Sequence, residues 1–391
     1  MLHKRLFLVL LAFSWLLTGC WHVMPVDRRG MVTAIGVDKG QHGQYLFSVA
    51  LVNPVGLPSP GGKGGTSNLP TSIVYSAASQ NLDQALHMMT AQSHLHWDLA
   101  HVQALAVSEE VAREGLLPVL DYFMRTSEIT ETARLFVARG SDARHLLESG
   151  EHLQPYQGIR IDETAMWTAM HLPYWSREVF DFVDHVPVSG KAPTLTGLSI
   201  ATQGEAKTPD FKIDGVAVFR GDKLIGWLSK PSCYGLAFAT GRVQHMGLSF
   251  PGPTPDGSFN VDATSAAPRI HVWQQNSVPF FTLDVHVKAY VTSVTPEVSF
   301  LAPENIKAFE GVASRVVLSD IVRVVSDTKS LGVDPIGFGE ALRVQQPSIW
   351  RAWTRKWPGE PYRSIPVRVS VSVALNSVGD KVQPLLQPTT Q

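Results

Sequence analysis

The residue with the clearest chemistry is Cys20, because it ends a segment with the composition of an export signal. The segment opens with a basic stretch (residues 1–5), continues with an apolar run (residues 6–17) and ends in the small residues Thr18 and Gly19. The apolar run is too short for a permanent transmembrane helix, which needs about 20 residues. A basic head, a short apolar core and a small-residue cleavage site are typical of a secretory signal. We therefore expect an exported protein.

A cysteine directly after such a signal indicates lipid attachment. Its thiolate is a nucleophile and can take a diacylglyceryl group as a thioether. Each buried CH₂ of a lipid adds about 0.8 kcal/mol, so two acyl chains give a stable anchor. We predict that residues 1–19 are a signal peptide and that Cys20 carries the lipid; a secreted protein with a chance cysteine is the alternative.

A second cluster with possible chemistry consists of His94, His96, Asp98 and His101. Two histidines at positions i and i+2 of an extended segment point to one face, and imidazole is a common zinc ligand. A connection between a helix and a strand also gathers polar residues without any metal. Since the three histidines His94, His96 and His101 have no clear fourth ligand and no recognisable partners that would orient them, we predict no bound metal and no cofactor.

Other candidate motifs lack the companions that their chemistry requires. The glycine-rich stretch 61–67 lacks the Gly-Lys-Ser/Thr ending of a phosphate loop, and residues 326–329 match Ser-x-x-Lys without its partner motifs. Cys233, the other cysteine of the mature chain, lies in an expected loop with no histidine to activate it. We find no catalytic set of residues and predict that the protein is not an enzyme.

The net charge and the composition limit the classes of molecule that the protein can bind. The 391 residues carry 33 Lys and Arg against 34 Asp and Glu, a net charge of −1, so no basic surplus is available to hold nucleic acid. Hydrophobic residues make up 44%, enough to fill two or three cores. With Cys20 lipidated, no internal disulfide can form, and the fold must rely on its cores.

Periodicity predicts mixed secondary structure in the first half. Strands are expected at 30–38, 44–53, 99–107 and 131–138. Helices are expected at 81–92, 108–125 (broken near Pro118), 141–148 and 162–184 (interrupted near Pro173). The segment 54–70 is rich in Gly, Pro and Ser and is expected to be a loop.

The second half is expected to be mainly β-structure. A hairpin is predicted at 211–228, and strands at 280–291 and 366–375 alternate as antiparallel strands with one wet face do. A long helix is predicted at 305–327 and a shorter one at 349–357. We predict an α+β fold of several mixed domains, with an antiparallel-rich C-terminal half and a long helix packed on a sheet. The boundary falls between residues 186 and 210, giving domains at 20–200, with two subdomains as an open alternative, and at 201–391.

Three tryptophans in the predicted short helix, Trp350, Trp353 and Trp357, share one helix face at i, i+3 and i+7. They either pack into the core against strand 366–375 or form a stripe that meets a partner or a membrane, where tryptophan is enriched. We assign Trp353 and Trp357 to the core and leave Trp350 open. The hairpin at 211–228, with Trp227, is expected to be structural.

Several short motifs also follow one another along the chain. They are Gly19-Cys20-Trp21, Ile35-Gly36-Val37-Asp38-Lys39, residues 81–86, Leu99-Ala100-His101-Val102-Gln103-Ala104-Leu105, Phe123-Met124-Arg125, the hairpin 215–219 with 223–228, and Asp334, Gly337-Phe338-Gly339, Pro347, Trp350 and Trp357. Their order and spacing resemble the Ger(x)C family of spore germination lipoproteins. The residues after the Cys-Trp pair, 22–25, and the loop 61–65 depart from the family pattern.

The resemblance implies a non-catalytic C subunit of a nutrient germinant receptor, with three mixed α/β domains. Such a subunit acts beside a membrane-embedded A subunit and a permease-like B subunit, and is lipid-anchored at the outer face of the spore inner membrane. Two other functions stay open from the residues alone. A solute-binding lipoprotein would carry repeated βαβ units in two lobes, which the second half does not favour, and an anchored hydrolase would need motifs that are missing.

Overall fold

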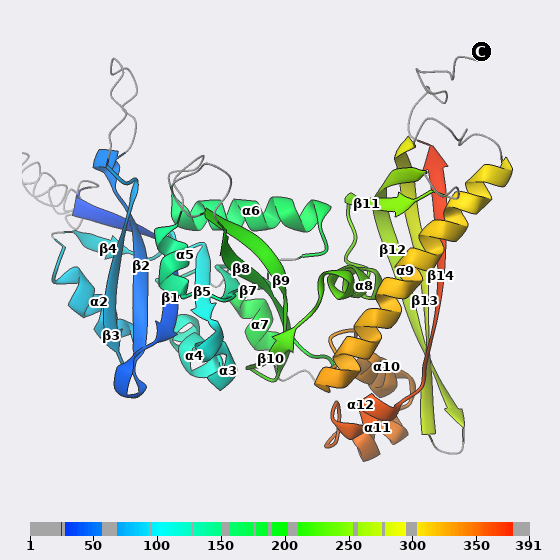
Figure 1. The fold of residues 1–391 in the computed structure, drawn as a ribbon. Helices are drawn as coiled ribbons and strands as arrows, with labels where there is room; N and C mark the ends of the chain where they lie inside the picture. Colours follow the sequence, from blue (N-terminus) through cyan, green and yellow to red (C-terminus); the bar gives the residue numbers. More distant parts are fainter. Residues whose placement is uncertain are drawn as a thin grey trace, which may run out of the picture.

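The computed structural model contains two β-sheets joined side by side (Figure 1). It describes residues 25, 28–56, 69–93, 95–126, 128–130, 132–149, 156–174, 177–186, 190–201, 210–252, 257–275, 278–294 and 303–377. Cys20, the loop 61–67 and His94 lie outside this set. Among the described residues, no helix is both long and apolar enough to cross a bilayer.

The first sheet has ten strands and a parallel centre. Its strands are, in order, β10 (Lys223–Trp227), β9 (Asp210–Arg220), β8 (Thr194–Ala201), β6 (Arg134–Ala138), β5 (Ala104–Ser108), β1 (Arg29–Lys39), β2 (Tyr45–Val52) and β3 (Ser72–Ser79), with β4 (His96–Asp98) beside β1 and β7 (Arg177–Glu178) beside β6. The four strands β1, β5, β6 and β8 run parallel, and antiparallel strands flank them on both sides.

Both faces of this sheet are buried, because helices cover each of them. One face is covered by α2 (Leu82–Thr90), α3 (Glu109–Glu114), α4 (Leu117–Arg125) and α7 (Val179–His185), and the other by α5 (Ala143–Glu148) and α6 (Gln157–His171). Leu105 and Val107 point to the first face and Ala104 and Ala106 to the second. This explains why the central strands read as continuous apolar runs.

Helix α5 is capped from a distant strand. The Asp38 carboxylate at the end of β1 accepts hydrogen bonds from the backbone N–H of Ala143 (2.7 Å) and Arg144 (2.9 Å). A carboxylate at a helix N-terminus satisfies free N–H groups and interacts favourably with the helix dipole. Burial nevertheless raises the pKa of Asp38, because desolvation outweighs these bonds.

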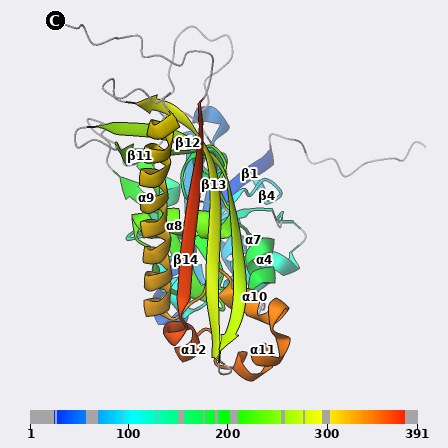
Figure 2. The same ribbon diagram turned by 90° about the vertical axis from the view of Figure 1, so that its right-hand side faces the viewer.

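The second sheet has four strands, and one long helix packs on it. Its order is β11 (Met246–Pro251), β12 (Ser258–Gln275), β13 (Val278–Val294) and β14 (Val367–Ser377), with β13 and β14 parallel and the other pairs antiparallel. Helices α8 (Lys230–Thr240) and α9 (Pro303–Leu331) cover one face, and α10 (Phe338–Gln345), α11 (Pro347–Trp353) and α12 (Glu360–Ser364) gather at the lower end (Figure 2).

The α+β class, the hairpin at 211–228 and the long helix on a sheet are confirmed. Helix α9 lies along the edge of β14, where the backbone N–H groups of Val373 and Leu375 donate to Ser314 Oγ and Glu310 Oε1, both at 3.0 Å. The structure adds that β9 and β10, beyond residue 200, complete the first sheet. The proposed division at 200 and 201 therefore does not coincide with the end of that sheet.

Several local predictions are wrong. The segment 99–103 is not a strand, because β5 begins only at Ala104. The helix at 108–125 breaks at Gly115, whose φ of 130° is unfavourable for other residues, and Pro118 lies in the first turn of α4, where no N–H is needed. Helices α8 and α10 were not predicted.

Helices α8 and α9 approach closely at Gly235. A Cβ on Gly235 would lie 2.1 Å from the backbone oxygen of Asp320 in α9, whereas one on Gly311 would meet only the end of the Arg315 side chain at 3.6 Å. The absence of a side chain at Gly235 therefore sets the distance between the two helices.

We predict that Gly235→Ala lowers the melting temperature, since overpacking costs roughly 1–3 kcal/mol. Gly311→Ala is the matched control and should be neutral or stabilising by about 0.5–1 kcal/mol, because alanine favours the helix. Calorimetry of the two variants decides the matter, and equal melting curves would show that α8 and α9 can separate freely at this point.

Candidate functional site

The strongest constellation of buried polar groups lies at the junction of the two sheets and centres on Asp334. This carboxylate, which is 1% exposed, follows the end of α9. Its oxygens accept hydrogen bonds from the backbone N–H of Gly337 and Gly339, both at 2.8 Å. Asp334 thus closes the loop 334–339 and caps the N-terminus of α10. Burial raises its pKa to about 6, although the N–H groups act in the opposite direction.

The same loop is bonded to the segment that leads into β8. The N–H of Ala192 donates to the backbone oxygen of Asp334 (2.8 Å), and the N–H of Glu340 donates to the oxygen of Gly190 (3.0 Å). Gly190 has a φ of 99°, and a Cβ there would lie 2.6 Å from the backbone of Gly339. Residues 190–192 therefore link the first sheet to the loop of the second unit by backbone contacts that need glycine.

Aromatic side chains form the wall behind this loop. Trp350 and Trp357 pack edge to face with ring centroids 6.0 Å apart, and Trp357 also contacts Tyr362 at 5.4 Å. The Tyr362 hydroxyl is hydrogen-bonded to Thr328 Oγ1 at 2.8 Å. A Cβ on Gly339 would lie 2.3 Å from Nε1 of the Trp357 indole, so the absence of a side chain at this glycine lets the ring approach the loop closely.

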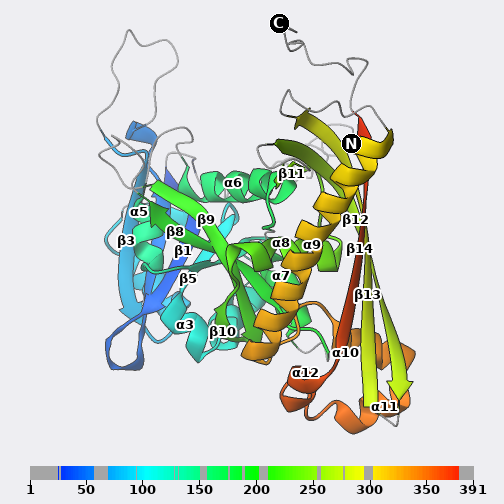
Figure 3. The same ribbon diagram turned by 45° about the vertical axis from the view of Figure 1, so that its right-hand side comes forward.

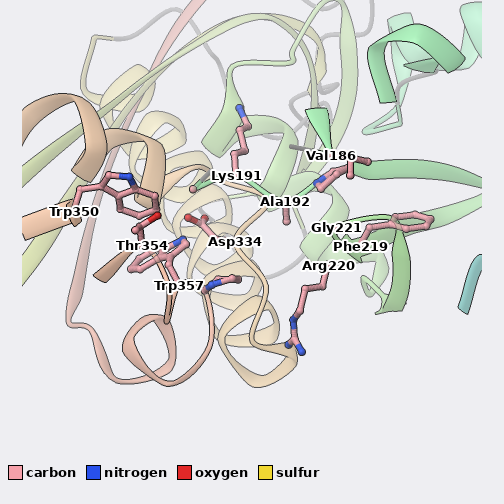
Figure 4. Close-up of a pocket in the computed structure, with 13 residues that line it drawn as sticks. Val186, Lys191, Ala192, Phe219, Arg220, Gly221, Asp334, Trp350, Thr354 and Trp357 are labelled. Atoms are coloured by element: carbon pink, nitrogen blue, oxygen red, sulfur yellow. The ribbon is translucent and has the colours of Figure 1, made fainter. Parts of the chain in front are cut away.

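A cavity of about 230 Å³ opens between the wall and the first sheet (Figure 4). It is lined by Val186, Gly190, Lys191, Ala192, Pro193, Phe219, Arg220, Gly221, Asp334, Trp350, Thr354, Trp357 and Pro358. Two of its charged groups, Arg220 and Asp334, are engaged by backbone groups. Arg220 donates to the backbone oxygens of Leu331 (3.2 Å) and Gly332 (3.1 Å). Burial lowers the pKa of Lys191, against the attraction of Glu340.

This arrangement positions chain segments rather than reacting groups. Both Asp334 oxygens are held by backbone N–H groups, and Arg220 is held by backbone oxygens. The junction is thus suited to fixing one sheet against the other. The family resemblance grouped Asp334, Gly337-Phe338-Gly339, Pro347, Trp350 and Trp357. The structure brings Asp334, the two glycines and the two tryptophans together at this junction.

The sequence did not reveal the contribution of residues 190–192. Their only local signal is a Gly-Lys-Ala-Pro run, which is typical of any turn.

The assignment of Trp353 and Trp357 to the core is confirmed, but the single helix face predicted for the three tryptophans is wrong. Helix α11 ends at Trp353, so Trp357 does not share its face and instead lies after a turn. Trp350, which was left open, is the most buried at 7% exposure, while Trp353 and Trp357 are half-buried against the same core. All three pack on the core of the four-stranded sheet. Their order of burial differs from the predicted one because the helix ends and the chain turns at Thr354.

The histidine cluster does not assemble into a metal site among the described residues. His96 and His101 are both exposed, and the nearest ion-pair contact joins His101 Nε2 to Asp98 Oδ2 at 3.9 Å. His94 lies outside the described set, so the absence of a metal stays a prediction.

Cys233 lies in helix α8 and not in a loop, which corrects the sequence-based prediction. Its side chain is fully buried, and burial raises the pKa of its thiol to about 12. A thiol of this kind is inert at neutral pH. The Ser-x-x-Lys match falls within α9. The Lys329 ammonium group donates to the backbone oxygen of Ile365 and so links α9 to the segment before β14.

Comparisons with known proteins agree with this architecture. The family "Spore germination protein N-terminal domain" matches residues 22–200, and the family "Spore germination B3/GerAC like, C-terminal" matches residues 214–379. Spore germination protein KC of Bacillus subtilis (strain 168) is 22% identical over 400 residues, covering 98% of each chain. Spore germination protein B3 of the same organism is 19% identical and covers 90% of this chain and 91% of its own.

A crystal structure of the GerBC protein has the same fold, with a TM-score of 0.54 and 17% identity over 87% of this chain and 96% of that one. Two spore germination domains therefore follow one another along nearly the whole chain. The chain belongs to the Ger(x)C family of spore germination proteins.

The raised pKa of Asp334 predicts a pH-dependent stability. Between 3.8, the ordinary value, and about 6, the folded state holds the Asp334 proton while the unfolded state has released it. The contribution of Asp334 to the unfolding free energy therefore falls as pH rises through this window. Asp334→Asn cannot ionise and should flatten the fall, although it loses one acceptor for the loop.

Urea unfolding of both proteins at a series of pH values measures this effect. The matched control is Asp327→Asn, which removes a carboxylate from the same helix–loop region, where it accepts from Ser232 Oγ at 2.5 Å. An Asp334→Asn profile that follows the unmodified protein through pH 4–6 would contradict the assignment.

Proposed function

We propose that this protein is a lipid-anchored, non-catalytic subunit of a spore nutrient germinant receptor. It acts beside the membrane-embedded A and B subunits, at the outer face of the spore inner membrane. The observation that carries the proposal is the ordered match of both germination domains over residues 22–200 and 214–379. The near-complete mutual coverage with spore germination protein KC supports it.

The chemistry of the buried groups supports a non-catalytic role. Asp334 has both oxygens engaged by backbone N–H groups, and the thiol of Cys233 is buried with a raised pKa. Neither group is available to a substrate. The junction instead fixes the relative position of the two sheets. Such a rigid arrangement suits a subunit whose role is to contact other receptor subunits.

Attachment to the membrane is proposed through Cys20. The sequence Leu17-Thr18-Gly19-Cys20 at the end of a short apolar run supports lipidation of its thiol. The alternative of a solute-binding lipoprotein is not supported. A ten-stranded mixed sheet and a four-stranded sheet do not form the two similar lobes that such proteins use.

The anchor is tested by Cys20→Ser, which should abolish incorporation of radioactive fatty acid and release the protein from the membrane fraction. Cys233→Ala is the matched control, because it removes the other cysteine of the mature chain and should leave labelling unchanged. Equal incorporation of the label into Cys20→Ser and the unmodified protein would contradict lipid attachment at Cys20.

The receptor role is tested in spores that produce an affinity-tagged protein. Mild detergent extraction should recover the A and B subunits with the tagged chain, and deletion of the gene should abolish germination by one class of nutrient. Germination that proceeds normally with every nutrient tested, together with recovery of the tagged chain alone, would refute the proposed role.

A further inference from the structure

One side of the molecule carries two groups of exposed apolar side chains. The first consists of Met166 and Trp167 on α6 and of Leu172 directly after the helix, all of them exposed, Trp167 by 64%. Ile161 and Ala165 of the same helix are buried against the sheet. With 3.6 residues per turn, Trp167 falls on the opposite side of the helix from Ala165. Helix α6 therefore presents methionine and tryptophan away from the sheet.

The second group lies where β1 begins, β2 ends and β3 begins. The pairing of Leu51 with both Val32 and Ile73 brings these strand ends together. Large apolar side chains are exposed here on four residues, namely Met31, Val55, Leu69 and Ile73.

Both groups lie on the same side. Helix α6 and the β2–β3 end lie in the upper part of the molecule in Figure 1 and in Figure 3, and the start of β1 does so in Figure 1. The first turn of α6 contacts β1 directly, since the N–H of Gly158 donates to Thr33 Oγ1 at 3.3 Å. From there α6 extends about 20 Å along the upper side. We call the two groups together the upper apolar surface.

The covalent tether fits this surface. Arg28, where β1 is about to begin, follows Cys20 by eight residues, which span at most about 29 Å when extended. Trp167 lies nine residues, or about 13 Å, along α6 from Gly158. A lipid on Cys20 therefore keeps a bilayer within reach of both groups. The exposed Arg28 that follows the tether suits anionic headgroups, whereas the Arg29 guanidinium lies 3.5 Å from the Asp98 carboxylate.

We propose that the upper apolar surface contacts the phospholipid bilayer in which Cys20 is anchored. Tryptophan is favoured at the boundary between headgroups and acyl chains, and an amphipathic helix can lie there with its apolar side down. The contact fixes the orientation of the protein on the membrane. This inference rests on the proposed lipid anchor and adds which face is turned to the lipid.

The far end of the second sheet provides a matched control. Trp273 in β12 is also exposed, by 54%, and lies near the turn into β13. The 17 residues of β13 span roughly 55 Å. The end of β12 and the start of β13 lie at the lower end in Figure 2, so with the upper apolar surface on the bilayer Trp273 faces water.

The test uses the full lipidated chain reconstituted in phospholipid vesicles, with an NBD fluorophore attached at Trp167→Cys or at Trp273→Cys. Labelling is selective, because Cys233 is fully buried and Cys20 carries the lipid. We expect nitroxide-bearing phospholipids to quench NBD at residue 167 and aqueous iodide to quench it at residue 273.

The outcomes separate the two proposals. Vesicle flotation of both labelled proteins, with residue 167 quenched by iodide and not by nitroxide lipid, would overturn the membrane-facing surface while the anchor stands. Equal recovery of lipidated and Cys20→Ser protein with vesicles would instead contradict the anchor. Quenching of residue 273 by nitroxide lipid would show that the opposite end meets the bilayer and would also overturn the proposal.

Discussion

Strand β9 is the constraint on which the architecture depends, because its two faces are buried in two different cores. Ala217 and Phe219 belong to the core beneath α3, α4 and α7, whereas Val216 and Val218 belong to the core of the second unit, with α8 and α9. Since side chains of a strand alternate between faces, one four-residue stretch contributes to both cores at once. Separation of the two sheets would therefore expose apolar side chains on one face of β9 to water.

The Asp334 junction adds polar specificity to this apolar contact. The loop 334–339 and residues 190–192 bond through their backbones, and Arg220 at the end of β9 donates to the last carbonyls around α9. These contacts lie beside β9, so polar and apolar interactions hold the same two units at one place. The angle between the two sheets is therefore fixed. If the upper apolar surface of the first sheet faces the membrane, the second sheet then also has a defined position relative to the bilayer.

Much of the fold could be predicted from the sequence where one face of an element is wet. The alternation in β13 and β14 and the helical period of α9 are clear because water and core lie on opposite sides. Helix α8 was missed because seven of its residues are buried, which removes the amphipathic periodicity, and because Gly235 lies in the interior of the helix, where glycine is unfavourable.

Long-range partnerships could not be predicted. Asp38 caps α5 across 105 residues of sequence, and the loop of Asp334 bonds to residues 190–192, more than 140 residues earlier. Nothing local to Asp38 or Ala192 indicates these partners. The resemblance to a family did identify the residues of the Asp334 loop as one group, but only the fold shows that they meet the first sheet.

The central claim is that β9 and the Asp334 junction make the two sheets one cooperative unit. Hydrogen exchange of the mature chain in increasing urea, followed separately for amides of β5 in the first sheet and β13 in the second, tests it most directly. The account predicts that both strands lose protection at the same urea concentration, in one transition. Loss of protection in β13 while β5 stays fully protected, or the reverse, would contradict it.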